Sequence, residues 1–211
     1  MKYSHVLWDF NGTILNDVSV GIESANILLK RHGLSAISNE DEYRNIFCFP
    51  IIEYYRKLGF NFELNPYDEL AVEWVEIYNS LVHKAYIYDG VIQLLTLIRN
   101  SNTKQLILSA TELKMLKGQL KSLGISEYFD EVLGTGNIYA YSKKDIAVNW
   151  VNETKPNKAV LIGDTSHDKS VADAAGFDCV LIANGHECKE KLAQTGAIVV
   201  DSVFEVIEYL I

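Results

Sequence analysis

Three apolar runs with the length of buried strands end in side chains that could do chemistry. Asp9 closes the first run, and Ser109 follows the second. Asp164 and Asp168 follow the third, and Lys143 lies in the chain before it. Ligands bind outside the carboxyl ends of the strands in a parallel α/β sheet, so we expect these side chains to face one rim of such a sheet.

These residue types suit phosphoryl transfer. The Asp9 carboxylate could act as a nucleophile without first losing a proton, and would form an aspartyl-phosphate. Several carboxylates beside a phosphate would repel it, so we expect a hard divalent cation, Mg²⁺, among them. Ser109 and a lysine would then hold the phosphoryl oxygens, because positioning and charge stabilisation dominate this reaction.

Taken singly, each of these residues has a simpler explanation. An aspartate at the end of a strand is more often a turn former or a helix cap. Asp164 and Asp168 could be a cap and a first-turn acid of one helix, and Lys143 could be solvated. The functional interpretation therefore depends on the order of these residues and on their shared position at strand ends.

The chain alternates between strand and helix patterns except in one long segment. After an apolar strand at residues 3–10, residues 16–85 show helical spacing at 18–31, 39–47, 51–58 and 67–84, with no strand signal. Further strands are expected at 105–108, 131–133, 159–162, 179–182 and 197–200, and helices at 91–99, 112–123, 144–151, 166–175, 189–194 and 203–210. This pattern predicts an α/β fold, a doubly wound parallel sheet of residues 1–15 and 86–211, with residues 16–85 as a helical insert.

The composition limits the possible partners. Apolar residues make up 48% and charged residues 22% of 211 residues, as in ordinary globular proteins. The net charge of −9 argues against nucleic acid or an anionic membrane, but not against a small anion bound through a divalent cation. Cys48, Cys179 and Cys188 form no C-x-x-C pair, and we see neither a transmembrane run nor a signal-peptide core. We therefore expect a cytoplasmic protein, whose oligomeric state is left open.

The motifs together resemble those of the haloacid dehalogenase superfamily of hydrolases, and within it the phosphoglycolate-phosphatase-like branch. The family's first motif, D-x-D-G-T, corresponds to residues 9–13 (DFNGT), and its fourth, G-D-x-x-x-D, to residues 163–168 (GDTSHD). Ser109 and Lys143 stand at the second and third motifs. The resemblance covers the whole chain and implies a Rossmann-like core, an inserted all-α cap, Mg²⁺ and a small phosphorylated substrate.

The resemblance also implies roles for single residues. It makes Asp9 the nucleophile and a Mg²⁺ ligand, with Asp164 and the main-chain carbonyl of Asn11 as further ligands. Asp168 would complete the metal site or support the lysine. Phosphate or substrate would be bound by Phe10, Ser109, Ala110 and Lys143. The sequence alone does not separate Lys143 from its neighbour Lys144.

Asn11 departs from the family pattern, which has a second acid at this position. That acid protonates the leaving group and then activates water, whereas an amide neither gives nor takes a proton at neutral pH. Three interpretations follow: a leaving group acidic enough to need no protonation (an acyl phosphate or anhydride), a substitute acid such as His167 or His186, or a protein that turns over slowly and mainly binds. The Mg²⁺ site is expected to survive in each case.

Substrate selection is expected to lie in the insert. Candidates to face the active site are Arg44, residues 47–50, Tyr54, Tyr55 and Arg56. The simpler explanation is that these aromatic residues form the core of the insert and that the arginines are solvated.

Three alternatives compete with a phosphatase. Residues 163–170 partly match a nucleotide-binding P-loop, but Asp168 stands where its second glycine must let the backbone wrap a phosphate. A dehalogenase would use the same Asp9 and would not need the acids at 164 and 168. A binding or phospho-aspartate signalling module is the main rival because of Asn11, although a helical cap that excludes water favours a hydrolase.

Overall fold

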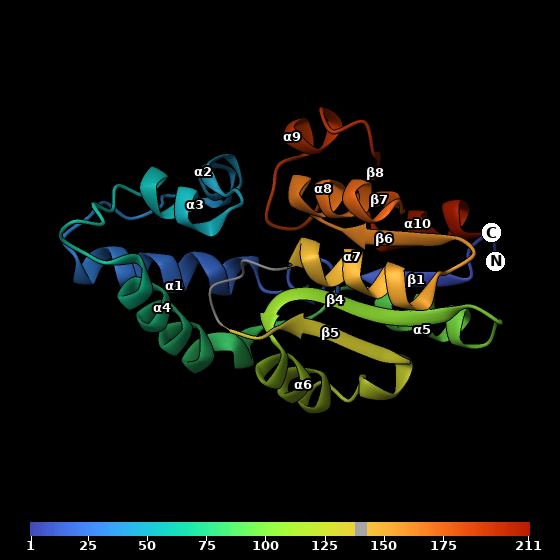
Figure 1. Cartoon of the computed structure of the whole chain (residues 1–211). Coiled ribbons are helices and arrows are strands. Elements are labelled where there is room, and N and C mark those ends of the chain that lie inside the picture. The colour runs from blue at the N-terminus through green and yellow to red at the C-terminus, as the bar shows by residue number, and fades with distance from the viewer. Residues whose placement is uncertain (138–142) are drawn as a thin grey trace.

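The computed structural model describes residues 1–137 and 143–211, and its centre is a six-stranded sheet in which all neighbouring strands are parallel. The strand order is β5-β4-β1-β6-β7-β8, so the first strand of the chain lies near the middle (Figure 1). The strands are β1 (His5–Trp8), β4 (Lys104–Glu112), β5 (Glu131–Thr135), β6 (Ala159–Gly163), β7 (Asp178–Ile182) and β8 (Ile198–Val200). The predicted parallel α/β fold is confirmed, with β4 running on to Glu112, where a helix was expected to begin.

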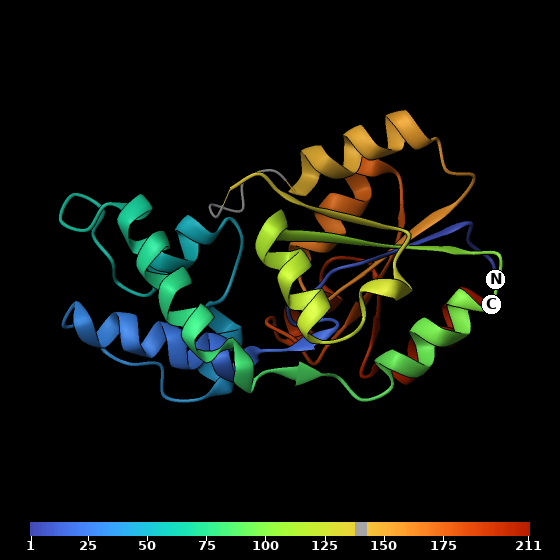
Figure 2. The ribbon, with the colours of Figure 1, turned by 90° about the horizontal axis from the view of Figure 1, so that it is seen from below.

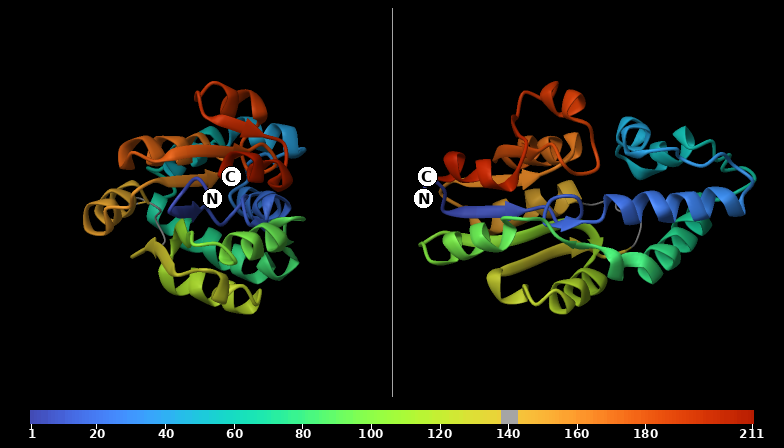
Figure 3. Two further views of the ribbon diagram at one scale, coloured as in Figure 1. Left: turned by 90° about the vertical axis from the view of Figure 1, so that its right-hand side faces the viewer. Right: turned by 180° about the vertical axis from the view of Figure 1, so that it is seen from behind.

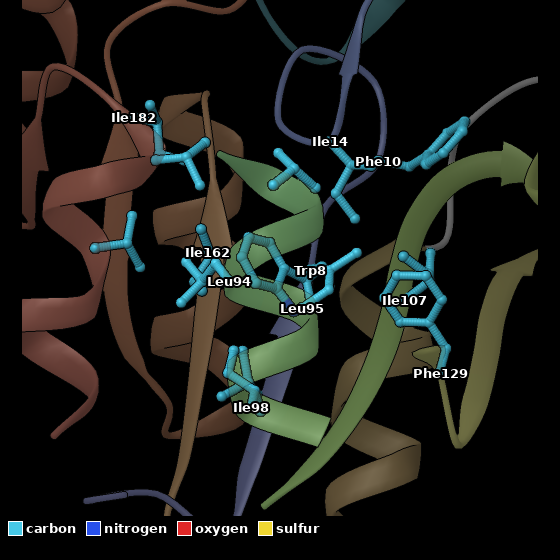
Figure 4. Packing of buried hydrophobic residues seen from close by; sticks show 14 of the residues in the cluster. Trp8, Phe10, Ile14, Leu94, Leu95, Ile98, Ile107, Phe129, Ile162 and Ile182 are labelled. Atoms are coloured by element: carbon cyan, nitrogen blue, oxygen red, sulfur yellow. The ribbon is translucent and has the colours of Figure 1, made fainter. Parts of the chain in front are cut away.

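Successive side chains of a strand point to opposite faces of the sheet, and here helices cover both faces. Val6 and Trp8 pack in a cluster with α5 (Val91–Arg99), α6 (Leu113–Ser122) and α10 (Val203–Leu210). Figure 4 shows the part of this cluster in which Trp8 lies beside Leu94, Leu95 and Ile98 of α5. Leu7 packs in the opposite cluster with α7 (Lys143–Thr154), α8 (Ser166–Ala175) and the short α9 (Lys189–Ala193). Burial on both faces explains why the strands are continuous apolar runs.

Four helices lie beyond the carboxyl ends of the strands, away from both chain termini (Figures 1 and 3). They are α1 (Val18–Arg31), α2 (Glu40–Ile46), α3 (Ile51–Lys57) and α4 (Tyr67–Leu81), and together we name them the helical segment. Their buried side chains, among them Leu28, Tyr55 and Leu70, form a hydrophobic cluster separate from the two that flank the sheet. The helical segment therefore has a core of its own.

A short antiparallel pair joins the helical segment to the rest of the chain (Figure 2). β2 (Leu15–Asn16) pairs with β3 (Tyr86–Ile87), where the chain enters and leaves the segment. The prediction of no strand in residues 16–85 is therefore wrong at Asn16, because a two-residue strand is too short to show a period-2 pattern. The fourth predicted helix also ends early, since Val82–Lys84 form a 3₁₀ turn, and a second such turn, Ser126–Tyr128, had no recognised signal.

The chain ends meet on the side of the sheet away from the helical segment (Figure 3). There the Lys2 N–H donates a hydrogen bond of 2.7 Å to the Leu210 carbonyl. Within residues 1–137 and 143–211, no helix combines the length and the apolar composition that crossing a membrane requires.

Candidate active site

Three buried carboxylates meet at the carboxyl edge of the sheet. Asp9 follows β1, Asp164 follows β6, and Asp168 lies in the first turn of α8. One oxygen of each lies within 4.8 Å of the other two. The strand order explains the meeting, because β1 and β6 are direct neighbours in the sheet. The structure thus brings together three residues that the sequence placed at strand ends.

Local hydrogen bonds hold Asp168 in place. Its Oδ2 accepts from the Thr165 N–H at 3.1 Å and from the Thr165 hydroxyl at 2.6 Å, and the Thr165 side chain caps α8 in return. A glycine is needed at position 163, because a Cβ there would lie 2.4 Å from the carboxyl carbon of Asp168. The G-D-x-x-x-D spacing therefore puts one acid at the strand end and the next in the first turn of the following helix.

Lys143 pairs with two of the three acids. Its Nζ lies 2.5 Å from Oδ1 of Asp9 and 2.5 Å from Oδ1 of Asp168, and its side chain is only 3% exposed. Burial opposes a charge on Lys143, but the two carboxylates raise its pKa above the ordinary value. Lys144 is exposed. The structure therefore places Lys143, and not its neighbour, inside the site.

The three acids differ in how readily they ionise. Burial raises the pKa of Asp9 to about 6, although the Lys143 ammonium favours its charged form. Burial likewise raises the pKa of Asp164 well above its ordinary value. For Asp168, burial is outweighed by Lys143 and Thr165, which hold its pKa low. A divalent cation would favour the charged form of all three, and this set of hard oxygen donors fits Mg²⁺.

The other predicted phosphate contacts lie at the same edge. Ser109 is buried in β4, and its Oγ accepts a hydrogen bond of 3.1 Å from the Thr111 N–H. The Phe10 side chain packs in the core (Figure 4), so its contribution to the site is the main-chain N–H that donates to the Asp9 carboxylate. Ala110 lies with Ser109 on the wall of a cavity above the carboxylates.

Three hydrogen bonds occupy the Asn11 side chain. Its Nδ2 donates to Oδ2 of Asp17 at 2.8 Å and to the Tyr78 hydroxyl at 2.9 Å. Its Oδ1 accepts from the Thr111 hydroxyl at 2.8 Å. Since Tyr78 belongs to α4, the Asn11 amide connects the edge of the sheet to the helical segment.

Asp17 is a fourth buried carboxylate in the site, and no motif pointed to it. It is 2% exposed, accepts a 2.9 Å hydrogen bond from the Gly12 N–H, and lies 3.3 Å from Nε2 of His186. The Tyr78 hydroxyl donates to it at 2.6 Å. Burial opposes its ionisation, but these partners, His186 foremost, hold its pKa below the ordinary value. The available signal was an acid shortly after Asn11, the position where the family's second acid is missing.

The two histidines considered as substitute acids differ in their surroundings. His186 lines the cavity, pairs with Asp17, and has its Nδ1 at 2.8 Å from the Tyr43 hydroxyl. Burial alone would lower the pKa of His186, but Asp17 raises it to about 9. His167 stacks on Phe49, with 4.4 Å between ring centroids, and burial lowers its pKa to about 4. The structure therefore places His186, and not His167, on the cavity wall.

The cavity, of about 170 Å³, lies between the edge of the sheet and the helical segment. Its sheet wall contains the predicted site residues Asp9, Asn11, Ser109, Ala110, Lys143 and Asp164. Its helical wall is mostly aromatic and includes Tyr43, Phe47, Phe49, Tyr54, Trp74 and Tyr78. Six of the eight predicted site residues thus form one wall of a cavity that the helical segment completes, whereas Phe10 and Asp168 do not line it.

The aromatic residues that were candidates to face the site line this cavity, whereas the two candidate arginines do not. Phe47, Phe49, Tyr54 and Tyr55 are part of the lining. Arg44 instead donates to the main-chain carbonyls of Gly185 at 2.9 Å and Asn184 at 3.2 Å. Arg56 forms a surface ion pair with Glu53. These two candidates are therefore not part of the cavity wall, because main-chain carbonyls and a neighbouring acid occupy them.

Comparison with known proteins agrees with this geometry. The chain matches the family of haloacid dehalogenase-like hydrolases over residues 6–182. It is similar to a phosphoglycolate phosphatase of Photobacterium profundum, with 26% identity over 96% of this chain and 93% of that protein. It is also similar to the pyrophosphatase PpaX of Listeria monocytogenes, with 26% identity over 79% of this chain and 77% of that protein.

Among solved structures, protein tyrosine kinase A of Mycobacterium tuberculosis has a similar fold, with a TM-score of 0.83 and 21% identity over 99% of this chain and 98% of that one. The sheet order, the motifs at the strand ends and the extent of the family match lead to one assignment. The chain belongs to the haloacid dehalogenase-like hydrolases.

Proposed function

We propose that this hydrolase is a Mg²⁺-dependent phosphatase that transfers the phosphoryl group of a small substrate first to Asp9 and then to water. The observation that carries the proposal is the contact of Lys143 with Asp9 inside a cluster of three buried carboxylates at one wall of a cavity. A nucleophilic carboxylate, a fixed cation and oxygen donors for a divalent ion are the groups that phosphoryl transfer needs.

Asp9, Asp164 and the main-chain carbonyl of Asn11 would hold the Mg²⁺, and Asp168 would complete this set or support Lys143. When bound, Mg²⁺ would offset the repulsion between the carboxylates and a phosphate and would stabilise charge on the phosphoryl oxygens. Lys143 is already fixed against Asp9, so it would meet those oxygens without rearrangement.

Two displacements would complete the reaction. The Asp9 carboxylate attacks phosphorus, the bond from phosphorus to the leaving oxygen breaks, and the leaving group departs with the electron pair. Water then attacks the phosphoryl group on Asp9, which releases inorganic phosphate and restores the carboxylate. Ser109 and the main chain around Ala110 would hold the phosphoryl oxygens during both steps.

Asn11 restricts the leaving group. Its amide is occupied by Asp17, Tyr78 and Thr111, so it orients its neighbours without supplying a proton. General acid–base assistance is typically worth about 10²–10⁴-fold in rate. We therefore expect substrates whose leaving oxygen is acidic enough to depart as an anion, and slow turnover of esters whose leaving group is an alkoxide.

We also propose that residues 16–85 act as a cap on a core of residues 1–15 and 86–211. The β2–β3 pair lies where the chain crosses between the two parts, and the cavity lies between them. A cap over bound substrate would keep bulk water from the phosphoryl group. The names of the relatives, a phosphoglycolate phosphatase and a pyrophosphatase, support a small phosphorylated substrate without agreeing on one. Three free cysteines support a cytoplasmic location.

Phosphate release from acetyl phosphate, measured with Mg²⁺ and with a chelator, tests this function. We expect Mg²⁺-dependent release that falls by about 10⁶-fold in Asp9→Asn, since loss of a nucleophile costs about that much in other hydrolases. Asp145→Asn, at an exposed acid of α7, is the matched control and should keep wild-type activity. Full activity in Asp9→Asn would contradict the assignment of the nucleophile.

The occupied Asn11 amide also suits a second function, a module that holds a phosphoryl group on Asp9 without releasing it. Intact-mass measurement after mixing with acetyl phosphate separates the two. A stable phosphoryl adduct without released phosphate would favour the module. Continuous release without a lasting adduct would favour the phosphatase.

A further inference from the structure

The helical wall of the cavity presents flat apolar surfaces to a ligand. Eight aromatic residues contribute to it, and Trp74 and Tyr78 stack on each other with 4.9 Å between ring centroids and 19° between ring planes. Met115 of α6 extends the apolar lining from the other side. Aromatic rings and methionine favour contact with another aromatic ring.

The cations in the cavity lining are already paired. Lys143 contacts Asp9 and Asp168, and His186 contacts Asp17. Among the described lining residues there is no other Lys, Arg or His. Residues 138–142, which lie outside the described part of the chain, are Ile-Tyr-Ala-Tyr-Ser and add no cationic residue. A second anionic group on a substrate would therefore find no free cation on the described walls.

Two further carboxylates make the lining still less suited to a second anion. Asp17 lines the cavity, and its carboxylate forms an ion pair with His186. Glu112 also lines it, and its carboxylate accepts hydrogen bonds from the Lys114 and Met115 N–H groups at 2.9 and 2.8 Å. A like charge brought next to these groups is disfavoured, whereas an uncharged group is not.

Tyr54 is a lining residue of the helical wall with a polar group that lacks a partner in the described structure. The Tyr54 hydroxyl is buried, with the residue 4% exposed, and it has no hydrogen-bond partner among residues 1–137 and 143–211. Burial raises the pKa of Tyr54, so the hydroxyl stays a neutral phenol. A buried polar group without a partner is destabilising, so a ligand that supplies the partner gains affinity.

We propose, on the basis of the phosphatase function proposed above, that the substrate is the phosphate ester of a small uncharged phenol whose ring lies on the aromatic wall and whose neutral polar substituent reaches Tyr54. The occupied amide of Asn11 supports the same class. When the bond between phosphorus and the aryl oxygen breaks, the phenolate leaves with the electron pair more readily than an alkoxide does, and takes its proton from water. Phosphoglycolate and pyrophosphate each carry a second negative group and fit these walls less well.

Binding of unreactive phosphonates tests the cavity without catalysis. In calorimetric titrations of the wild-type protein with Mg²⁺ present, we expect benzylphosphonate to bind about tenfold more tightly than phosphonoacetate, because its ring is buried and stacks on the aromatic wall. Phosphonoacetate carries the carboxylate that a glycolate ester would carry. If it binds as tightly as benzylphosphonate or more tightly, the proposal is overturned.

Tyr54→Phe tests the polar contact with the smallest possible change. In the wild type, 4-hydroxybenzylphosphonate should bind several-fold more tightly than benzylphosphonate, and Tyr54→Phe should remove that difference. Tyr86→Phe, at an exposed tyrosine outside the cavity, is the matched control and should preserve it. A difference that survives in Tyr54→Phe would overturn the role of this hydroxyl.

Kinetics separate this inference from the phosphatase function on which it rests. Acetyl phosphate has a small, acidic leaving group, so its Mg²⁺-dependent hydrolysis reports the function alone. We expect kcat/KM for phenyl phosphate to exceed that for phosphoglycolate. If acetyl phosphate is hydrolysed but phosphoglycolate is preferred over phenyl phosphate, the phosphatase stands and the aryl substrate is wrong. If acetyl phosphate is not hydrolysed, the phosphatase function is wrong, and the phosphonate ranking decides separately whether the cavity selects aromatic ligands.

Discussion

The two walls of the cavity hold their side chains by different means. On the sheet wall, Lys143 is fixed between Asp9 and Asp168 by charge-assisted hydrogen bonds of 2.5 Å. On the helical wall, rings such as those of Trp74 and Tyr78 are held by packing on one another. The sheet wall determines where charge is stabilised, and so which reaction is possible, whereas the helical wall determines the shape and polarity of the space beside it. Changes to the sheet wall should therefore slow every substrate, and changes to the helical wall should alter the preference among substrates.

A set of buried polar side chains connects these walls. Asp17 accepts hydrogen bonds from Asn11 and from Tyr78 of α4, and it pairs with His186, which in turn contacts Tyr43 of α2. An acid that stands at position 11 in the family is absent here, and a buried acid stands at position 17.

Exchanging Asn11 and Asp17 should produce the largest effects. Asn11→Asp alone sets two carboxylates in direct contact in a buried site, and we expect it to lower the free energy of unfolding by about 3–5 kcal/mol. Asn11→Asp with Asp17→Asn keeps one acid and one amide, so most of this loss should be recovered. Urea unfolding in chelator measures both, and a double variant no more stable than the single one would contradict direct coupling.

The same double variant restores an acid at position 11 and should change the chemistry. We expect kcat for an alkyl ester such as glycerol phosphate to rise by about 10²–10⁴-fold, the range of general acid–base assistance. Acetyl phosphate, whose leaving group needs no proton, serves as the internal control and should gain far less. An equal gain on both substrates would mean that position 11 does not act on the leaving group.

Removing the cation of the sheet wall should slow every substrate. Lys143→Met leaves two buried carboxylates without a counter-charge and takes a positive group from the phosphoryl oxygens, so we expect kcat for acetyl phosphate to fall by about 10²–10³-fold. Lys144→Met makes the same change at the exposed neighbour and should leave kcat within about twofold. A larger loss in Lys144→Met would reverse the assignment of the phosphate-binding lysine.

The Asp17–His186 pair between the walls should make stability depend on alkaline pH. The pKa of His186 is 6.5 in the unfolded chain and about 9 in the folded chain, so the folded state binds the proton more tightly. The raised pKa contributes about 3 kcal/mol to the free energy of unfolding. This contribution is complete below about pH 6.5, decreases above it, and is lost beyond about pH 9. Asp17 has a lowered pKa, so its own contribution is lost instead as the pH falls into the acid range.

Urea unfolding in chelator, measured from about pH 6 to about pH 10, checks this expectation. This pH range spans the pKa values of His186 in the unfolded and folded chain, about 6.5 and about 9. His186→Gln should flatten the dependence, whereas His83→Gln, at an exposed histidine, should leave it as in the wild type. If His186→Gln retains the wild-type slope, the pair does not contribute as proposed.

The contrast between the walls also explains how much the sequence could predict. Asp9, Ser109 and Asp164 each end a continuous apolar run, and a parallel sheet collects such positions at one edge whatever the strand order. Lys143 begins a helix, and neither its position in the chain nor the family resemblance separated it from Lys144. The contact between Asp17 and Tyr78 spans 61 positions of the chain and depends on how α1 packs against α4, which no local pattern reports.

Arginine placement on the helical segment shows the same limit. Helical periodicity puts Arg44 on α2, but its direction depends on the loop after β7, whose carbonyls it binds. The aromatic residues were expected either in the core of the insert or at the active site, and Tyr54 belongs to both, because it is part of the hydrophobic cluster and of the cavity lining. Helical periodicity and composition do not distinguish a core residue from a cavity-lining residue here, because the core of the helical segment also forms a wall of the cavity.

The smallest effect is expected from a substitution of Arg44. Arg44→Met removes hydrogen bonds to the carbonyls of Gly185 and Asn184, and we expect the free energy of unfolding to fall by about 1–2 kcal/mol. Because Arg44 does not line the cavity, KM for acetyl phosphate should change by less than about twofold. Arg56→Met, which breaks a surface pair with Glu53, is the control and should cost under about 1 kcal/mol.

The opposite result would be informative about the walls. If Arg44→Met raised KM for acetyl phosphate without loss of stability, the helical segment would be supplying a cation to the substrate. The division of the cavity into a charged sheet wall and an uncharged helical wall would then be wrong, and an anionic leaving group would again fit. Retention of KM with a measurable loss of stability would instead mean that Arg44 holds the two walls together, and that the charge used in the reaction comes from the sheet edge.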